Sequence, residues 1–135
     1  MAYRPQLIEH LVSPRNVGEL VNADGAGESG DAACGDIARF TVRIEENAVA
    51  EVGYKVYGCA PCIAAGSAMT ELVDGRSLIS AAAVTREDLR AALGGELPEG
   101  KEHALTLVLD ALHKAFEEYW NWKADEVSLV EGYRG

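Results

Sequence analysis

Three cysteines, one aspartate and one histidine are the residues of this chain whose types and spacing could do chemistry. Cys59 and Cys62 are separated by two residues, and the third cysteine, Cys34, stands two residues before Asp36. A CxxC pair at the start of a helix brings both sulfurs to one side of the first turn, where unpaired backbone N–H groups stabilise thiolates and lower their pKa. Thiolates bind soft metals or attack sulfur, so the pair predicts half of a metal site or a redox dithiol.

Cys34 and Asp36 flank a glycine at positions i and i+2. In an extended segment both side chains leave on the same face, and the glycine lets another group approach the backbone closely. The two residues therefore fit a two-ligand edge of a metal site. On this pair alone, a buried cysteine beside a turn aspartate is favoured, because free cysteine is among the most buried residue types.

His103 follows the linker 97–100 and lies in the first turn of the last predicted helix. By itself it would be interpreted as a surface histidine, as are His10 and His113. The three cysteines with Asp36 and His103 form a soft but mixed donor set, which suits zinc, copper(I) or an iron–sulfur cluster. An oxygen or imidazole ligand among sulfurs should hold a cluster less firmly than four thiolates, which would suit a protein that releases its cluster.

The elements that must position these residues can be predicted from hydrophobic periodicity. Residues 37–44 and 49–57 alternate apolar and polar side chains, which predicts two half-buried strands, and the short turn between them makes the strands antiparallel. A short strand is also expected within the glycine-rich segment 22–36. Helices are predicted at 3–12, 61–73, 77–83, from Thr85 to Gly94, and at 101–122, with a polar tail of unassigned structure from about 123 to 135.

This order predicts a single α+β domain over residues 1–135, with a small antiparallel sheet packed against several helices and a long C-terminal helix. The CxxC pair then lies at a strand-to-helix junction after an antiparallel hairpin. A thioredoxin-like redox motif would be expected within a βαβ unit, so this context favours the metal interpretation without excluding the redox one.

Composition limits the partners and the compartment. Twelve Lys and Arg residues against 22 Asp and Glu give a net charge of −10, which opposes binding to nucleic acid and to anionic membrane surfaces. No apolar run approaches the roughly 20 residues of a membrane span, and residues 1–10 contain no signal-like apolar stretch. We therefore expect a cytoplasmic protein.

Several spaced segments of the chain form a recognisable series. They are Met1-Ala2-Tyr3, Ile8-Glu9-His10, Pro14-Arg15-Asn16-Val17-Gly18, Cys34-Gly35-Asp36, Gly58-Cys59 with Ile63-Ala64 and Thr70-Glu71, and Lys101-Glu102-His103. In this order they resemble the U-type iron–sulfur cluster assembly scaffolds, namely IscU and the N-terminal domain of NifU. The resemblance covers the chain from about Tyr3 to Trp120.

The resemblance implies a scaffold rather than an enzyme. Such a protein would receive sulfur from a cysteine desulfurase, bind iron, build a transient [2Fe–2S] cluster and pass it to apo-proteins. Carried over residue by residue, Cys34 and Cys59 are ligands, Asp36 is the residue whose position favours a labile cluster, and His103 is an alternative ligand. The isolated protein would also accept zinc, and a homodimer could share one cluster because each chain offers few thiolates.

The sequence departs from the family pattern at two places. The family's third cysteine, which directly follows the histidine and is implicated in accepting sulfur, is Ala104 here, whereas Cys62 is additional. Cys62 either replaces the missing ligand from one helical turn away, or the site has lost part of the chemistry. The segment Leu97-Pro98-Glu99-Gly100-Lys101 stands where the family has Leu-Pro-Pro-Val-Lys, which weighs against recognition by an Hsp70-type chaperone.

We therefore predict a scaffold-like site of Cys34, Cys59 and Cys62, assisted by Asp36 and His103. Two alternatives remain from the sequence. One is a zinc- or iron-binding relative that modulates a cysteine desulfurase or delivers metal without building clusters. The other is a thiol oxidoreductase that uses Cys59 and Cys62.

Overall fold

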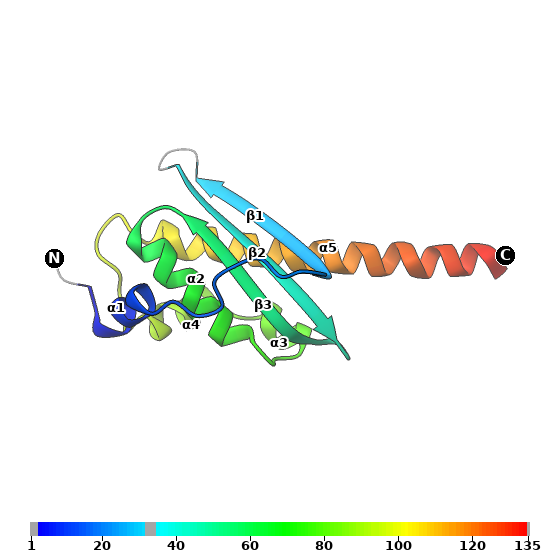
Figure 1. Ribbon diagram of the computed structural model, residues 1–135, viewed down its shortest axis with the longest axis horizontal. Helices are drawn as coiled ribbons and strands as arrows, with labels where there is room; N and C mark the ends of the chain where they lie inside the picture. The colour runs from blue at the N-terminus through cyan, green and yellow to red at the C-terminus, as the bar shows by residue number, and fades with distance from the viewer. Residues whose placement is uncertain (1–2, 32–34, 135) are drawn as a thin grey trace.

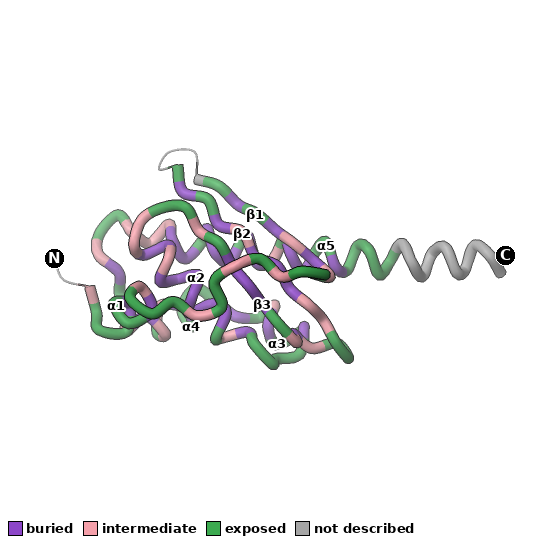
Figure 2. Tube along the Cα trace, in the orientation of Figure 1, coloured by how far each residue is buried: buried purple, intermediate pink, exposed green. Residues whose placement is uncertain are grey.

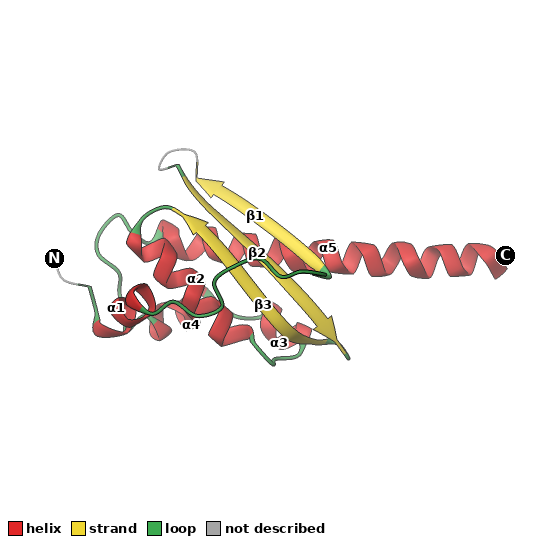
Figure 3. Cartoon of the chain, viewed as in Figure 1, coloured by secondary structure: helices red, strands yellow, loops and turns green. Residues whose placement is uncertain are grey.

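The predicted hairpin is the centre of the fold and forms two strands of a three-stranded antiparallel sheet in the order β1-β2-β3. The protein is described by a computed structural model, which covers residues 3–31 and 35–134. Figures 1 and 3 show the three strands side by side, crossing in front of α5. The elements are α1 (Pro5–Val12), β1 (Gly25–Asp31), β2 (Asp36–Glu45), β3 (Ala48–Tyr57), α2 (Ala60–Val73), α3 (Leu78–Ala82), α4 (Arg86–Ala92) and α5 (His103–Arg134).

Strands β2 and β3 pair in a register that confirms the alternating pattern. Phe40 lies opposite Tyr54 and Val42 opposite Val52, and all four side chains are buried on the helix-covered face. The connecting turn places Glu46 and Asn47 at φ +50 and +60, which is the two-residue hairpin turn that matches the twist of the strands. The α+β class predicted from the sequence is therefore confirmed.

Strand β1 explains the glycine-rich segment that precedes Cys34. A Cβ atom on Gly25 or Gly27 would lie 2.2 Å from the carbonyl oxygen of Ala115 or 2.3 Å from that of Ala111, both in α5. These glycines thus let β1 pack directly against the backbone of the long helix. Because β1 pairs with β2, this contact also fixes the strand that carries Asp36 over the first half of α5.

The core lies between the sheet and the two helices α2 and α5, where Figure 2 shows the most continuous buried stretches. Helix α2 carries many small side chains, and its buried members include Ala64, Ala65 and Ala68. Small residues let α2 lie close to β3 and to α5, with Met69 and Phe116 filling the remaining space. The start of α2 is thereby held rigidly next to the end of β3.

The helix boundaries follow the sequence signals with one difference. Thr85 and Asp88 form the reciprocal capping box predicted at the start of α4, and Gly75, just after α2, has φ +79. The sequence predicts that the long helix ends near residue 122, but it continues to Arg134. No glycine or proline occurs between residues 101 and 131, so no local signal ends the helix there.

A buried polar network joins α1 to α2. His10 Nδ1 lies 2.8 Å from Ser67 Oγ, which also accepts the backbone N–H of Arg15 at 2.8 Å, and Asn16 donates to Thr70 Oγ1 at 3.0 Å. The interpretation of His10 as a surface histidine is therefore wrong, since only 9% of it is exposed. Its helical position on α1 faces α2, and the residues of the Pro14–Gly18 segment fold back over the same face.

Within the described ranges, no helix is long and apolar enough to cross a membrane.

Candidate metal centre

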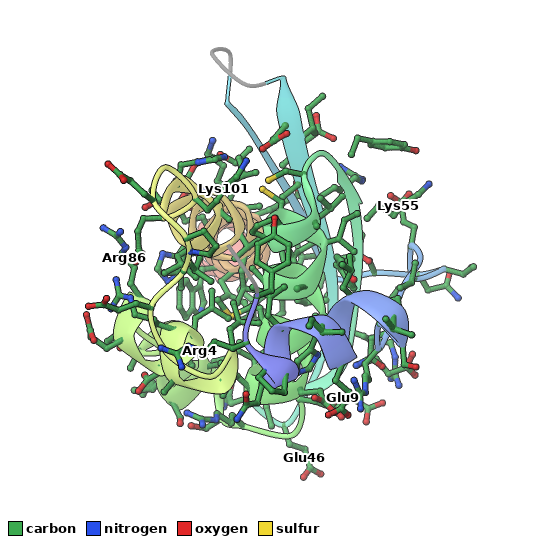
Figure 4. All side chains as sticks on the ribbon, turned by 90° about the vertical axis from the view of Figure 1, so that its left-hand side faces the viewer. Arg4, Glu9, Glu46, Lys55, Arg86 and Lys101 are labelled. Atoms are coloured by element: carbon green, nitrogen blue, oxygen red, sulfur yellow. The ribbon has the colours of Figure 1, made fainter. Side chains whose placement is uncertain are left out.

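Four potential ligands come together at one end of the molecule, each at the beginning of a secondary-structure element. Asp36 is the first residue of β2, Cys59 caps α2, Cys62 lies in the first turn of α2, and His103 is the first residue of α5. Figure 4 views the molecule from this end, where Lys101 marks the approach to α5. Because element boundaries are fixed by packing, the four side chains are held on rigid supports rather than on long loops.

The ligand atoms of these four residues all lie within 4.8 Å of one another. Asp36 Oδ2 is the common partner, at 3.2 Å from Cys62 Sγ, 3.5 Å from Cys59 Sγ and 3.1 Å from His103 Nε2. The two sulfurs are 3.3 Å apart. Ligands of a tetrahedral zinc ion, at about 2.0–2.3 Å from the metal, are separated from each other by roughly 3.3–3.8 Å. The four separations just given are close to this range, and the others stay within 4.8 Å, so a small contraction would let the group surround one ion.

The orientation of His103 is fixed by a backbone group. Its Nδ1 lies 3.1 Å from the carbonyl oxygen of Gly100, which can only accept, so Nδ1 carries the proton and donates. In the neutral ring Nε2 then presents a lone pair, and it faces the carboxylate oxygen of Asp36. Two acceptors at this distance need a proton or a metal ion between them. A histidine held through Nδ1–H by a carbonyl is the usual arrangement of a metal ligand.

Asp36 is buried, yet it is held in its charged form. Burial opposes ionisation, but it is outweighed by hydrogen bonds from the Cys62 and Cys59 thiols and by the proton that His103 Nε2 shares with Asp36 when no metal ion is bound. The pKa of Asp36 therefore lies below its ordinary value. The backbone N–H of Cys59 adds a further donor. A fixed negative charge is thus present beside two sulfurs and an imidazole, which favours a cation.

The expectation that the helix start lowers the pKa of the thiols is wrong for Cys62. Its side chain is fully buried, and burial together with the neighbouring Cys59 and Asp36 raises the pKa of Cys62. The favourable partial charge of a helix N-terminus is smaller than this cost of burying a second negative charge. Without a cation Cys62 therefore remains a thiol that donates to Asp36, whereas a bound metal ion would deprotonate it.

Two features of the site were missed by the sequence argument. A Cβ atom on Gly58 would lie 2.5 Å from Asp36 Oδ1, so this glycine provides the space that the carboxylate occupies. Arg90 of α4 makes a two-pronged contact with Glu102, at 3.3 and 3.1 Å, and thereby holds the residue just before His103. Gly58 had a local signal, since it directly precedes Cys59, but the contact between Arg90 and Glu102 depends on tertiary packing.

The structure places Ala104 and Cys62 of the positions discussed in the sequence analysis, but not Cys34. Cys34 lies outside the described residues, and only its neighbours Gly35 and Asp36 belong to the described chain. Ala104, which stands at the family's third cysteine, is fully buried beside His103. Cys62, in contrast, is brought into contact with Asp36, so the additional cysteine lies where a ligand could act. The ligand roles of Cys34, Cys59, Cys62, Asp36 and His103 remain predictions.

Comparison with protein families decides the relationship that the motifs suggested. The model of the NifU-like N-terminal domain matches residues 2–126. The chain belongs to this family. The match covers the sheet, all the helix starts that carry the candidate ligands, and most of α5.

Individual relatives of this NifU-like domain have two kinds of architecture. The bifunctional protein NifU/MnmA of Rubrobacter xylanophilus is 56% identical over 131 residues, which are 96% of this chain but 27% of that protein. The chain thus spans about a quarter of that relative. The iron–sulfur cluster assembly scaffold protein IscU of Escherichia coli K12 is 38% identical over 123 residues, which cover 88% of this chain and 94% of IscU.

The fold is also found in a solved NifU-like structure. The N-terminal NifU-like protein of Brucella abortus superposes with a TM-score of 0.64, over 87% of this chain and 94% of that one, at 19% identity. At this identity the likeness supports the fold alone. Together with the scaffold names of the curated relatives, the family assignment is consistent with a carrier role rather than an enzymatic one.

Proposed function

We propose that this protein is a scaffold on which iron and sulfide are assembled into a transient [2Fe–2S] cluster that is passed to apo-proteins. The observation that supports this proposal most directly is the convergence of Asp36, Cys59, Cys62 and His103, with their ligand atoms within 4.8 Å of one another. Cys62 takes the place of the absent third cysteine in this proposal, and Cys34 completes the set of thiolates.

The mixed donor set suits release as well as binding. A cluster held partly by oxygen and imidazole is less firmly bound than one held by four thiolates, and Asp36 can return to its hydrogen bonds with Cys59, Cys62 and His103 once the cargo has left. When the cluster leaves, the hydrogen bonds of the metal-free site therefore re-form and replace the bonds to the cluster. Zinc would fit the same donors in the isolated protein.

The partners in this proposal are those of a sulfur-accepting carrier. They are a cysteine desulfurase, recipient apo-proteins and, for a cluster shared between chains, a second copy of this chain. We propose that these reactions occur in the cytoplasm. Recognition by an Hsp70-type chaperone remains the prediction with least support, because Glu99 and Gly100 change the segment that would carry it.

The proposal is tested by anaerobic reconstitution of the full chain with ferrous iron and inorganic sulfide. We expect visible charge-transfer absorption, acid-labile sulfide in stoichiometric amounts, and transfer of the cluster to an apo-ferredoxin. Absence of labile sulfide together with tight, stoichiometric zinc binding would overturn the proposal in favour of a metal-binding modulator of a desulfurase. A variant Ala104→Cys serves as the matched positive control, because it restores the family's cysteine.

A further inference from the structure

We propose that Cys59 and Cys62 form a reducing dithiol, which converts a persulfide sulfur carried on Cys59 into sulfide and closes to a disulfide in the same step. The inference rests on the proposed function, because the sulfide would be produced beside the groups proposed to hold iron. It assigns to this site a redox activity in addition to cluster binding. The required sulfur donor is a persulfide, and the required regenerating reagent is a dithiol reductant.

The geometry of the two cysteines is close to that of a disulfide. Their sulfurs lie 3.3 Å apart, and the backbone N–H of Cys62 donates to the carbonyl of Cys59 at 3.0 Å, which fixes the turn between them. A disulfide bond is about 2.05 Å long, so closing it requires a movement of roughly 1.3 Å that side-chain rotation can supply. CxxC pairs at helix starts are the common framework of reversible dithiols.

The two thiols differ in accessibility, and this difference gives each a separate role. Cys59 is partly exposed, whereas Cys62 has no exposed surface. Of the two, only Cys59 can therefore meet an external persulfide donor. Cys62 lies directly behind it in the position of a resolving cysteine, which attacks once its partner has been modified.

The reaction balances without any further redox partner. The Cys62 sulfur attacks the Cys59 sulfur of the Cys59–S–SH group, the bond between the two sulfurs of that group breaks, and hydrosulfide leaves with the electron pair. The sulfane sulfur gains two electrons, and the two cysteine sulfurs lose one each. The products are the Cys59–Cys62 disulfide and one molecule of hydrogen sulfide.

Asp36 lies where the proton of this step must go. Its Oδ2 accepts the hydrogen bond of the Cys62 thiol at 3.2 Å and is also within 3.5 Å of the Cys59 sulfur, from which hydrosulfide departs. The proton of Cys62 can thus pass through this oxygen to the leaving hydrosulfide. The reaction needs no displacement of the carboxylate.

The test uses the reduced, metal-free chain of residues 1–135 and inorganic tetrasulfide as the persulfide-forming probe. After anaerobic treatment, removal of the probe and alkylation, we expect Cys59 and Cys62 of the wild-type protein to carry no alkyl group and to have lost two hydrogen atoms between them. Peptide mapping should locate the disulfide at Cys59–Cys62, and a colorimetric assay of the reaction mixture should detect about one sulfide per chain more than with Cys59→Ser. A wild-type protein that instead keeps a persulfide on Cys59, or forms no such disulfide, would overturn the inference.

Two single-residue variants distinguish the roles of the two cysteine sulfurs. Cys62→Ser should retain the added sulfur on Cys59 and release sulfide at least about tenfold more slowly, because the resolving thiolate is absent. Cys59→Ser should neither take up sulfur at this position nor form the disulfide. Sulfide release from Cys62→Ser at the wild-type rate would contradict the proposal. Peptide mapping of the wild-type protein remains decisive even if a variant is unstable.

Failure of this inference is distinguishable from failure of the proposed function. Reconstitution from ferrous iron and inorganic sulfide does not need a persulfide. A cluster formed from these reagents, with no persulfide reduction, would remove the dithiol activity alone. No cluster from inorganic sulfide would instead overturn the scaffold proposal on which the inference rests.

Discussion

Two polar clusters, each containing a histidine, lie in different parts of this molecule and differ in how their hydrogen bonds are completed. Around His10, every group that the described contacts involve has a matching donor or acceptor: Ser67 accepts from the Arg15 backbone and can donate to His10 Nδ1, while Nε2 faces Glu71 at 3.4 Å. This cluster is complete without any ligand.

The cluster around His103 is not complete in the same sense. With Nδ1–H donated to Gly100, Nε2 and the Asp36 oxygen that it faces need a proton or a cation between them, and two thiols also point to that oxygen. A histidine beside a carboxylate occurs in both clusters, so this pair of residue types alone does not separate them. The matching of donors and acceptors separates them: it is complete around His10, and around His103 it supports the proposed cation-binding role.

Among changes that distinguish the His103 cluster from the His10 cluster, we expect the largest loss of zinc affinity from His103→Gln and Cys62→Ser. Each variant removes one proposed ligand, so we expect zinc affinity to fall at least about 100-fold, which corresponds to about 2.7 kcal/mol. Titration calorimetry with a competing chelator measures it. His10→Gln is the matched control and should lower stability while leaving zinc affinity unchanged. Equal losses of zinc affinity in His10→Gln and His103→Gln would break the distinction between the clusters.

Ser67→Ala tests whether the cluster around His10 stabilises the fold. It leaves the half-buried backbone N–H of Arg15 and the buried ring of His10 without their shared partner, so the free energy of unfolding should fall by about 1–3 kcal/mol. Urea denaturation measures the loss, and zinc affinity should stay at the wild-type value. Ser80→Ala, at an exposed helical position, is the control and should change stability by less than about 0.5 kcal/mol. A Ser67→Ala protein as stable as wild type would refute the structural role.

Gly58→Ala should weaken the metal centre without removing a ligand. The new Cβ atom would lie 2.5 Å from Asp36 Oδ1, so the carboxylate must rotate away from Cys62 and His103. We expect zinc affinity to fall by about tenfold, as for other changes that disturb ligand orientation. Gly30→Ala in β1, whose Cβ would find only ordinary contacts, the nearest at 3.8 Å, is the control. Unchanged zinc binding in Gly58→Ala would show that the position of Asp36 is not required.

The smallest expected effect is a pH dependence of stability that belongs to His10. Burial lowers the pKa of His10 below its ordinary value of 6.5, and the attraction of Glu71 only partly opposes this. As pH falls below about 6.5 the unfolded chain binds a proton before the folded protein does, so the free energy of unfolding should decrease, by at most about 1.4 kcal/mol per pH unit. The contribution is fully present above that pH.

Urea denaturation of the wild type and of His10→Gln, between about pH 7.5 and pH 5.5, measures this dependence. The His10→Gln variant should lose the part of the slope that His10 contributes. If both proteins showed the same slope over this range, the titrating group would lie elsewhere.

Local patterns predicted most of the fold. Alternating side chains in β2 and β3, the capping box at Thr85 and the proline at the start of α2 are each interpretable from neighbouring residues. The extension of α5 beyond residue 122 was missed because helix ends without glycine or proline carry little local signal. The burial of His10 was missed for a different reason, since it depends on a partner 57 residues away.

By itself, the sequence determined the strands, the helix starts, the family and the set of chemically capable residues, because these depend on periodicity and short spacings along the chain. Only the tertiary structure decided that Cys62 points toward Asp36, that the Gly100 carbonyl fixes the ring of His103, and that Gly58 leaves room for the carboxylate. These contacts join β2, α2 and α5, whose relative positions result from packing of the whole core. A donor set becomes a site only when that packing brings its atoms within reach of one ion.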